Sequence, residues 1–437
     1  MRTPIAPCSR VQPDAWIFGL ALSSLALGGL GGSAQPSRLF CLLLFPYAIR
    51  NIAALLSQKW SPVVAVTLIF AATIGVLSAL SVLWSVDPIL TMGYSLVLVV
   101  NFTPVVYVVT LDQRRRAELY AVSFKGWLTA LVLTLPLAAY ELITGIHFAF
   151  SLDERGGGPL TLLLPYASVF FGNFNDYSLY LTLCISALMM LMAGAVTSVT
   201  LKWVAGLSIM MAITMVIANT SRGAMIVVGI LVVAALILNL DRLKLVLMAL
   251  ALAMLLFIPW GIMDNDLFQF ILLRFSDFSY DLDGESGRLS ILGAGVKALM
   301  DSYGFGVGAG ASAIYLGSTN LDIIPNPHNI FLEWALNFGI LGLSIFLLHL
   351  MMLFFQLTIA WHQNRRKRSQ TGLVMIALLL LPIIGVVQSH LTGYTYFWMW
   401  YATLILIVQT LTTRQLHHVL RSNLFSINNE NSSNLQL

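Results

Sequence analysis

Residues 62–83 read PVVAVTLIFAATIGVLSALSVL, and this stretch decides the fold class of the chain. It contains no charged side chain, and at roughly 1.5 Å of rise per residue a helix of this length crosses the hydrocarbon core of a bilayer. The composition of the whole chain agrees: 58% of its 437 residues are hydrophobic and only 10% are charged. A typical soluble domain has about 25% charged residues. Lipid is therefore expected to be the main solvent of this protein.

Similar apolar stretches recur along the chain and predict an all-α integral membrane protein with about twelve transmembrane helices. The second stretch follows the first directly, which favours retained helices over a cleaved signal peptide. The predicted transmembrane helices cover residues 16–34, 38–57, 62–83, 90–111, 120–144, 173–196, 203–219, 223–240, 243–262, 329–360, 371–389 and 396–413.

The predicted organisation places transmembrane helices one to nine in residues 1–262 and helices ten to twelve in 329–413. Between them, residues 263–328 form a long outer loop, and a polar tail follows at 414–437. The loop has amphipathic stretches at 267–275 and 289–300 and a glycine-rich turn at 304–310, so it is expected to be partly helical. A loop of this length among short connections is typically functional or disordered, and its composition argues against disorder.

The distribution of basic residues predicts the orientation. With the amino terminus in the cytoplasm, 17 of the 23 lysines and arginines fall on the cytoplasmic side, as the positive-inside rule requires. The two densest clusters, Arg114–Arg116 and Arg365–Arg368, share that side. Both termini are therefore expected in the cytoplasm, with the long loop facing outward.

Three residues on the outer side could carry chemistry. Arg222 is expected at the start of a membrane helix, either as an interfacial anchor or as a cation awaiting an anionic ligand. Arg288 is expected at the start of an amphipathic helix in the long loop, where a salt bridge to Asp283 or Glu285 is the structural alternative.

The third residue is His328. Asn326 is the expected N-cap and Pro327 the first helical residue, which would place His328 in the first turn of a membrane helix. The helix dipole there favours a neutral imidazole, which a general base requires. A lone histidine at an interface can equally be structural.

The three side chains together fit one type of reaction. Two arginines provide permanent, bidentate recognition of a diphosphate, and a neutral histidine can take a proton from a hydroxyl. This combination suits transfer of a group from a diphosphate to an alcohol. At an outer membrane face, a lipid diphosphate that carries a sugar is the expected donor.

Four segments resemble the O-antigen ligase and O-antigen polymerase family of bacterial membrane glycosyltransferases. They are GNFNDYSLYL at 172–181, SRGA at 221–224, Arg288 with Leu292 in an Arg-x3-Leu pattern, and His328-Asn329 followed after nine residues by Gly339-Ile-Leu-Gly342. The resemblance covers residues 170–345. Leu343 stands where ligases often have a hydroxylated residue, so ligase and polymerase both stay open.

The resemblance implies a metal-independent, inverting glycosyltransferase of the inner membrane that needs no cofactor and whose site faces the periplasm. Its donor would be a glycan on undecaprenyl diphosphate, held by Arg222 and Arg288, and its acceptor a glycan or glycolipid hydroxyl activated by His328. Nucleic acid is not an expected partner, and the oligomeric state stays open. The acceptor or supporting residues are predicted to be Asn175, Asp176, Asn329 and His390.

Two other sequence features have simpler interpretations. The Asp-x-Asp patterns at 264–266 and 281–283 are interpreted as solvated loop acids rather than metal ligands. The aromatic residues that follow His390, namely Tyr394, Tyr396, Phe397 and Trp398, are expected to form an interfacial belt or to stack on acceptor sugars.

Two other classes of membrane protein compete with this hypothesis. A transporter or lipid-glycan flippase of twelve helices typically shows internal repetition, and this chain has no repeat. A structural scaffold would give no reason for two arginines and a histidine to lie on one side. Within the glycosyltransferases, ligase, polymerase and protein-glycosylating ligase differ in their acceptor, and the ligase is favoured.

Overall fold

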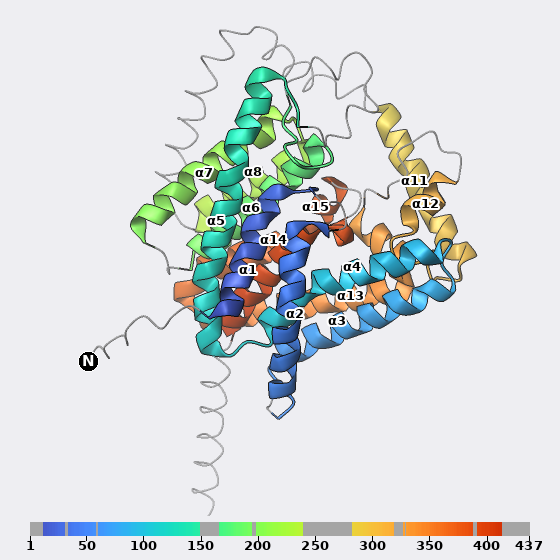
Figure 1. Cartoon of the computed structure of the whole chain (residues 1–437), viewed down its shortest axis with the longest axis horizontal. Coiled ribbons are helices and arrows are strands. Elements are labelled where there is room, and N and C mark those ends of the chain that lie inside the picture. Colours follow the sequence, from blue (N-terminus) through green and yellow to red (C-terminus); the bar gives the residue numbers. More distant parts are fainter. Residues whose placement is uncertain are drawn as a thin grey trace, which may run out of the picture.

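The computed structural model describes residues 12–30, 34–57, 60–148, 166–194, 198–238, 282–318, 327, 329–387 and 391–412, with side chains from residue 290 onward in the stretch that begins at 282. Every regular element among these residues is a helix (Figure 1). The predicted all-α class is therefore confirmed.

The described helices have the following bounds. In chain order they are α1 (Pro13–Ser23) with the 3-10 turn η1 (Ser24–Leu27), α2 (Pro36–Leu55), α3 (Pro62–Leu80) with η3 (Ser81–Leu83), α4 (Pro88–Val109), α5 (Gln113–Thr144), α6 (Phe174–Met192), α7 (Val199–Ala218), α8 (Arg222–Leu238), α11 (Leu282–Asp301), α12 (Ser312–Gly317), α13 (Ile330–Gln363), η8 (Arg365–Lys367), α14 (Arg368–Leu379), α15 (Leu381–Val387) and η9 (Leu391–Gly393). A last helix covers residues 395–412.

Seven of the described helices are long and apolar enough to cross a membrane: α2, α3 with η3, α4, α5, α6, α7 and α13. Two shorter apolar helices, α1 with η1 and α8, match further predicted spans. The protein is thus a multi-pass membrane protein. The count of twelve stays a prediction, and the expected helix at 243–262 lies outside the described residues.

Local capping explains where several helices begin. Proline occupies the start of α1, α2, α3 and α4, where its missing N–H costs nothing. Helix α5 begins at Gln113 and not near residue 120 as predicted, because the Asp112 side chain accepts the N–H of Arg115 at 2.9 Å. The basic residues Arg114–Arg116 therefore lie in the first turn of α5, not in a preceding loop.

Two predicted helices are interrupted. Helix α13 has a non-helical residue, Gly339, with φ 74° and ψ 178°. The predicted helix at 371–389 is divided between α14 and α15 at Leu380, two residues before Pro382, which has no N–H to donate.

The two basic clusters lie at one end of the bundle, called the basic end below. The Gln370 side chain donates to the Tyr120 hydroxyl at 2.6 Å and to the Met190 carbonyl at 3.1 Å, which joins the starts of α14 and α5 to the end of α6. Lys367 donates to the carbonyl of Thr410 at 3.2 Å, near the end of the last helix. The predicted common side of Arg114–Arg116 and Arg365–Arg368 is therefore confirmed.

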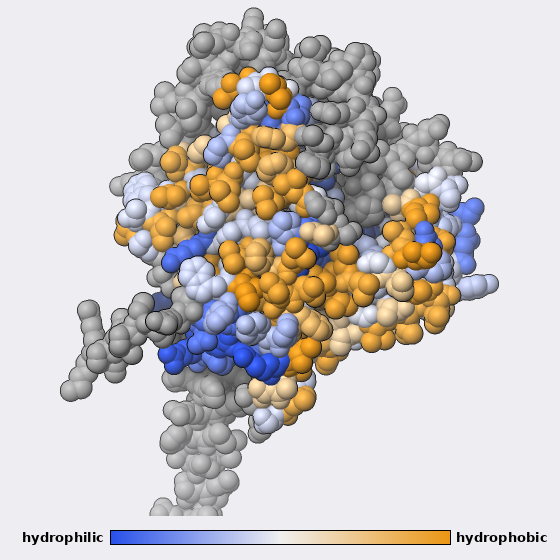
Figure 2. All heavy atoms as spheres, viewed as in Figure 1, coloured by the Kyte–Doolittle hydropathy of each residue, from blue (hydrophilic) through white to orange (hydrophobic). Residues whose placement is uncertain are grey.

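Polar and apolar side chains occupy different parts of the surface. Figure 2 shows hydrophilic side chains at the lower end of α1 and α5 and hydrophobic ones along the flanks. Large apolar side chains such as Leu43 on α2, Ile69 on α3 and Met351 on α13 are exposed. Helix α6 and the 395–412 helix are instead almost wholly buried and form the centre of the bundle. An exposed apolar flank of this extent is typical of a surface that contacts lipid.

Candidate active site

The predicted site residues that the structure describes gather at one end of the bundle. We call this the site end; α6, α8, α13 and the 395–412 helix begin there. Arg222 is the first residue of α8 and is partly exposed. Asn175 and Asp176 lie in the first turn of α6, and Asn329 is the N-cap of α13.

Three predicted site residues cannot be placed in full. Arg288 lies in the second turn of α11, and its side chain is outside the described atoms. His328 and His390 are outside the described residues, although their chain neighbours Asn329 and Leu391 are described.

Arg222 is positioned by a buried amide three residues before it. The Asn219 side chain pairs with both backbone groups of Ala167, accepting its N–H at 2.8 Å and donating to its carbonyl at 2.8 Å. It also donates to the Ser178 hydroxyl at 3.1 Å and to the Phe174 carbonyl at 3.4 Å. The start of α8 is thereby fixed against the first turn of α6.

The backbone segment around Ala167, to which Asn219 binds, is itself held by the buried carboxylate of Glu141. Glu141, near the end of α5, is fully buried and accepts the N–H groups of Ser168 at 2.7 Å, Val169 at 2.8 Å and Phe148 at 2.9 Å. Val169 and Thr220 both have φ 51°, which is unusual for β-branched residues. Backbone strain of this kind persists only where the surroundings enforce it and concentrates at functional sites.

Replacement of Asn219 by alanine is expected to destabilise the protein and lower its activity. The N–H and C=O of Ala167 would lose their partners in a buried position, at a cost of roughly 1–3 kcal/mol for a group left unsatisfied. Thermal unfolding of the purified protein measures the loss, with Asn364→Ala at the basic end as control. An Asn219→Ala protein that unfolds at the wild-type temperature would contradict this role.

Asp176 connects α6 to the segment before the last helix. It is 4% exposed, and its Oδ2 accepts the hydroxyl of Tyr394 at 3.3 Å. The Tyr394 ring stacks on that of Tyr396 with centroids 4.9 Å apart. Asn175, in the same turn, stays partly exposed.

The predicted aromatic belt is largely wrong. Tyr396, Phe397 and Trp398 are at most 5% exposed and pack inside the bundle, because the last helix is its central element. Only Tyr394 is partly exposed, and it lies next to Asp176.

The N-cap of α13 differs from the predicted N-cap by three residues. Asn329, not Asn326, is the N-cap: its side chain accepts the N–H groups of Phe331 at 2.9 Å and Leu332 at 3.2 Å. The helix therefore begins at Ile330. The expected first turn that begins at Pro327 and includes His328 is wrong, because the side chain of Asn329 satisfies the free N–H groups.

Glu333, in the first turn of α13, is a buried carboxylate that the sequence analysis missed. It accepts the N–H of Leu391 at 3.0 Å and that of Thr392 at 3.1 Å, and also the Thr392 hydroxyl. Tyr94 of α4 bonds the same hydroxyl. Residues 391–392, which directly follow His390, are thus tied to the first turn of α13, which directly follows His328-Asn329.

Residues 393–395 are held by side chains of α2 and α4. Arg38 of α2 donates to the carbonyl of Gly393 at 2.9 Å and to the hydroxyl of Thr395 at 3.2 Å. Asn101 of α4 donates to Gly393 at 3.2 Å and accepts from Thr395 at 2.9 Å. A continuous set of hydrogen bonds therefore runs from the start of α8 through α6 and residues 391–395 to the start of α13.

Several residues of this network carry a signal in the sequence. Glu141, Glu333 and Asn101 each interrupt a predicted membrane helix, and an ionisable or amide side chain within such a helix points to a buried polar contact. Which segment each would bind could not be deduced, because the partners are mostly backbone groups distant in sequence.

The side chains that could hold a metal ion are described for the residue ranges given above. Within those residues, no group of three or more His, Cys, Asp or Glu side chains is placed to hold a metal ion. The Asp-x-Asp patterns at 264–266 and 281–283 lie outside the described side chains. The metal-free mechanism therefore stays a prediction.

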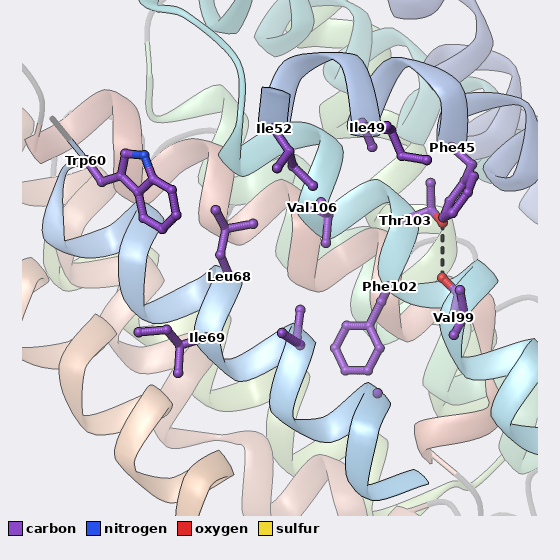
Figure 3. Close-up of a pocket in the computed structure, with 14 residues that line it drawn as sticks. Phe45, Ile49, Ile52, Trp60, Leu68, Ile69, Val99, Phe102, Thr103 and Val106 are labelled. Atoms are coloured by element: carbon purple, nitrogen blue, oxygen red, sulfur yellow. Dashed lines mark hydrogen bonds between the residues drawn. The ribbon is translucent and has the colours of Figure 1, made fainter. Parts of the chain in front are cut away.

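An apolar groove of about 530 Å³ opens between α2, α3 and α4 (Figure 3). None of the predicted site residues lines it, and the hydrogen bond drawn there joins the Thr103 hydroxyl to the Val99 carbonyl within α4 at 3.0 Å. Its chemistry fits a hydrocarbon chain and not a charged ligand. Its main lining side chains are Phe45, Ile49, Ile52, Trp60, Leu68, Ile69, Phe102 and Val106.

Comparison with known proteins relates part of the chain to a described family. No curated protein matches the chain. Residues 206–347 match a family model described as O-antigen ligase. The matched region includes Arg222 and the whole stretch from α11 to the break in α13. The chain is thus a multi-pass membrane protein whose residues 206–347 are similar to the O-antigen ligase family.

Proposed function

We propose that the protein transfers a glycan from an undecaprenyl-diphosphate-linked donor to a hydroxyl acceptor, most plainly as an O-antigen ligase whose acceptor is a lipid A-core sugar. The observation that carries this proposal is the placement of the starts of α8 and α13 at one end of the bundle, joined by the polar network of Asn219, Asp176 and Glu333. These two starts bear Arg222 and the His328-Asn329 pair.

The proposed roles follow from the chemistry of each side chain. Arg222 and Arg288 hold the diphosphate, whose charge they match as planar, permanently charged groups. His328 takes the proton of the acceptor hydroxyl while its oxygen bonds to the anomeric carbon. The bond from that carbon to the diphosphate oxygen breaks, the anomeric configuration inverts, and undecaprenyl diphosphate leaves with the bonding electron pair. Asn329 supports the site by capping α13, and Asp176 supports it by accepting the hydroxyl of Tyr394.

The proposed setting is the bacterial inner membrane. The basic end would face the cytoplasm, as the positive-inside rule favours, and both termini would lie there. The site end would then face the periplasm, where lipid-linked glycans are the available donors. This orientation rests on charge asymmetry and on the shared end of the two arginine clusters.

The ligase and the polymerase differ in what accumulates when the protein is lost. A deletion strain should accumulate free lipid-linked polymer, because a ligase acts after the chain is complete. The lipid-linked fraction can be resolved by gel electrophoresis and mass spectrometry, with the complemented strain as control. Accumulation of a single lipid-linked repeat unit would instead favour the polymerase that joins such units.

A further inference from the structure

The break in α13 leaves two backbone groups without their helical partners. In an unbroken helix the N–H of Ile340 would donate to the carbonyl of Leu336. Here Gly339, at φ 74°, separates them. The glycine turn, residues 304–310, supplies both replacements: the N–H of Val307 donates to Leu336 at 2.7 Å, and the N–H of Ile340 donates to the Gly304 carbonyl at 2.8 Å. The turn is thus inserted into the hydrogen-bond ladder of the helix.

The insertion brings two backbones into direct contact and leaves no room for side chains. A Cβ atom on Gly306, at φ 79°, would lie 2.8 Å from the Ala335 carbonyl oxygen. A Cβ atom on Gly339 would lie 2.7 Å from the Gly304 carbonyl oxygen. Since both residues also have positive φ, glycine is required at each position.

The glycine turn is also fixed to the connection between α3 and α4. The Ser81 hydroxyl accepts the N–H of Ala309 at 3.0 Å, and the Val307 carbonyl accepts the N–H of Val86 at 3.2 Å. On the other side, the Asn337 side chain accepts the N–H of Gly310 at 3.2 Å. The turn therefore has defined partners on both sides, and these backbone amides are not available to a ligand.

Helix α11 leads directly into this turn and packs on the first part of α13. The N–H of Gly304 donates back to the Leu299 carbonyl at 2.7 Å, which ends α11. A small apolar core joins Ile291 and Ala298 of α11 to Leu332 and Leu336 of α13. Figure 1 shows α11 beside the end of the α3, α4 and α13 group.

We propose that the glycine turn is a positioning device that sets α11, and with it Arg288, relative to the first turn of α13, which follows His328-Asn329. Gly306, Gly339 and Gly295 are then positioning residues that do not touch substrate. This inference rests on the proposed function, because Arg288 and His328 act in it as donor-binding and catalytic residues. A reaction that needs a diphosphate and a hydroxyl in register is sensitive to such placement, since a displacement of about 1 Å can cost about 100-fold in rate.

Two glycines of α11 provide a matched pair for the test. A Cβ atom on Gly295 would lie 2.8 Å from the Leu332 side chain, whereas one on Gly293 would meet nothing within 4 Å. Gly295→Leu should force α11 away from α13 and lower kcat by ~10-fold or more, with the donor KM changed less. Gly293→Leu, with the same helix propensity, should stay within about twofold of wild type. A Gly295→Leu enzyme with wild-type kcat would overturn the proposal.

The comparison is made on purified full-length protein in nanodiscs, with rates expressed per folded molecule. If the packing of α11 on α13 only stabilised the fold, Gly295→Leu would reduce the amount of folded protein and leave kcat per folded molecule unchanged, which also overturns the proposal. Arg288→Ala provides the reference for a lost donor contact.

Hydrogen exchange measured by mass spectrometry tests the insertion of the glycine turn into α13 without an activity assay. In the wild type, the amides of Val307 and Ile340 should exchange slowly, and in Gly306→Ala both should become faster together. Rapid exchange of both amides in the wild type would disprove the insertion. If the wild type transfers no glycan, the proposed function fails. The exchange data still test whether the glycine turn is inserted into α13.

Discussion

Replacement of Arg222 by alanine is expected to lower glycan transfer by about 100- to 1,000-fold, the usual effect of removing one group that stabilises developing charge. In the proposed reaction the leaving diphosphate gains negative charge as the sugar departs, and Arg222 at the start of α8 is the residue proposed to stabilise that charge. The first N–H groups of a helix favour an anion at the same position. The lost charge cannot be replaced by water at comparable strength.

Lysine at position 222 should restore transfer only in part, because an ammonium group lacks the planar, bidentate geometry of a guanidinium. Arg114→Ala is the matched control: Arg114 is an exposed arginine at the basic end and should be dispensable. Radiolabelled lipid-linked donor and purified protein give the rates. Full activity of Arg222→Ala would remove this residue from the site.

Replacement of His328 by glutamine is expected to abolish most turnover, by about 100- to 10,000-fold, because glutamine keeps a polar side chain of similar reach but cannot accept a proton. Wild-type activity should fall on the acidic side of neutrality as the imidazole gains a proton. Donor binding should survive in His328→Gln and His328→Ala, since both arginines remain. Rates across pH and donor binding by isothermal titration separate these effects.

A positioning role for His328 would give a different pattern. A hydrogen bond from the side chain to the acceptor could be made by glutamine as well. His328→Gln would then retain much of the wild-type rate and lose little more than acceptor affinity. A fast His328→Gln enzyme would therefore contradict the general-base assignment.

Much of the fold could be predicted because lipid imposes a simple pattern. The apolar stretch at 62–83 became α3 with η3, and the common side of Arg114–Arg116 and Arg365–Arg368 followed from charge alone. Helix ends were less accurate because they depend on single capping contacts. Because Asp112 is the N-cap of α5, that helix begins directly before the arginine cluster. Because Asn329 is the N-cap of α13, that helix begins after His328.

The motifs of the candidate site could be read from the sequence, but the contacts that surround them could not. The resemblance over 170–345 agrees with the family match at 206–347, and Arg222, Asp176 and Asn329 share one end of the bundle. Asn219 and Glu333 were missed because they bind backbone groups of segments remote in the sequence. The pattern Gly339-x-x-Gly342 marked a motif, but its physical reason, a helix broken to receive a second backbone, requires the three-dimensional arrangement.

The most direct test of the central claim is reconstitution of the purified protein with an undecaprenyl-diphosphate-linked glycan and a lipid A-core acceptor in the presence of EDTA. The account predicts that the glycan becomes attached to the acceptor in step with release of undecaprenyl diphosphate, and that Arg222→Ala stops both. Movement of the intact lipid-linked glycan across the bilayer without any transfer, or a strict need for a divalent metal ion, would contradict it.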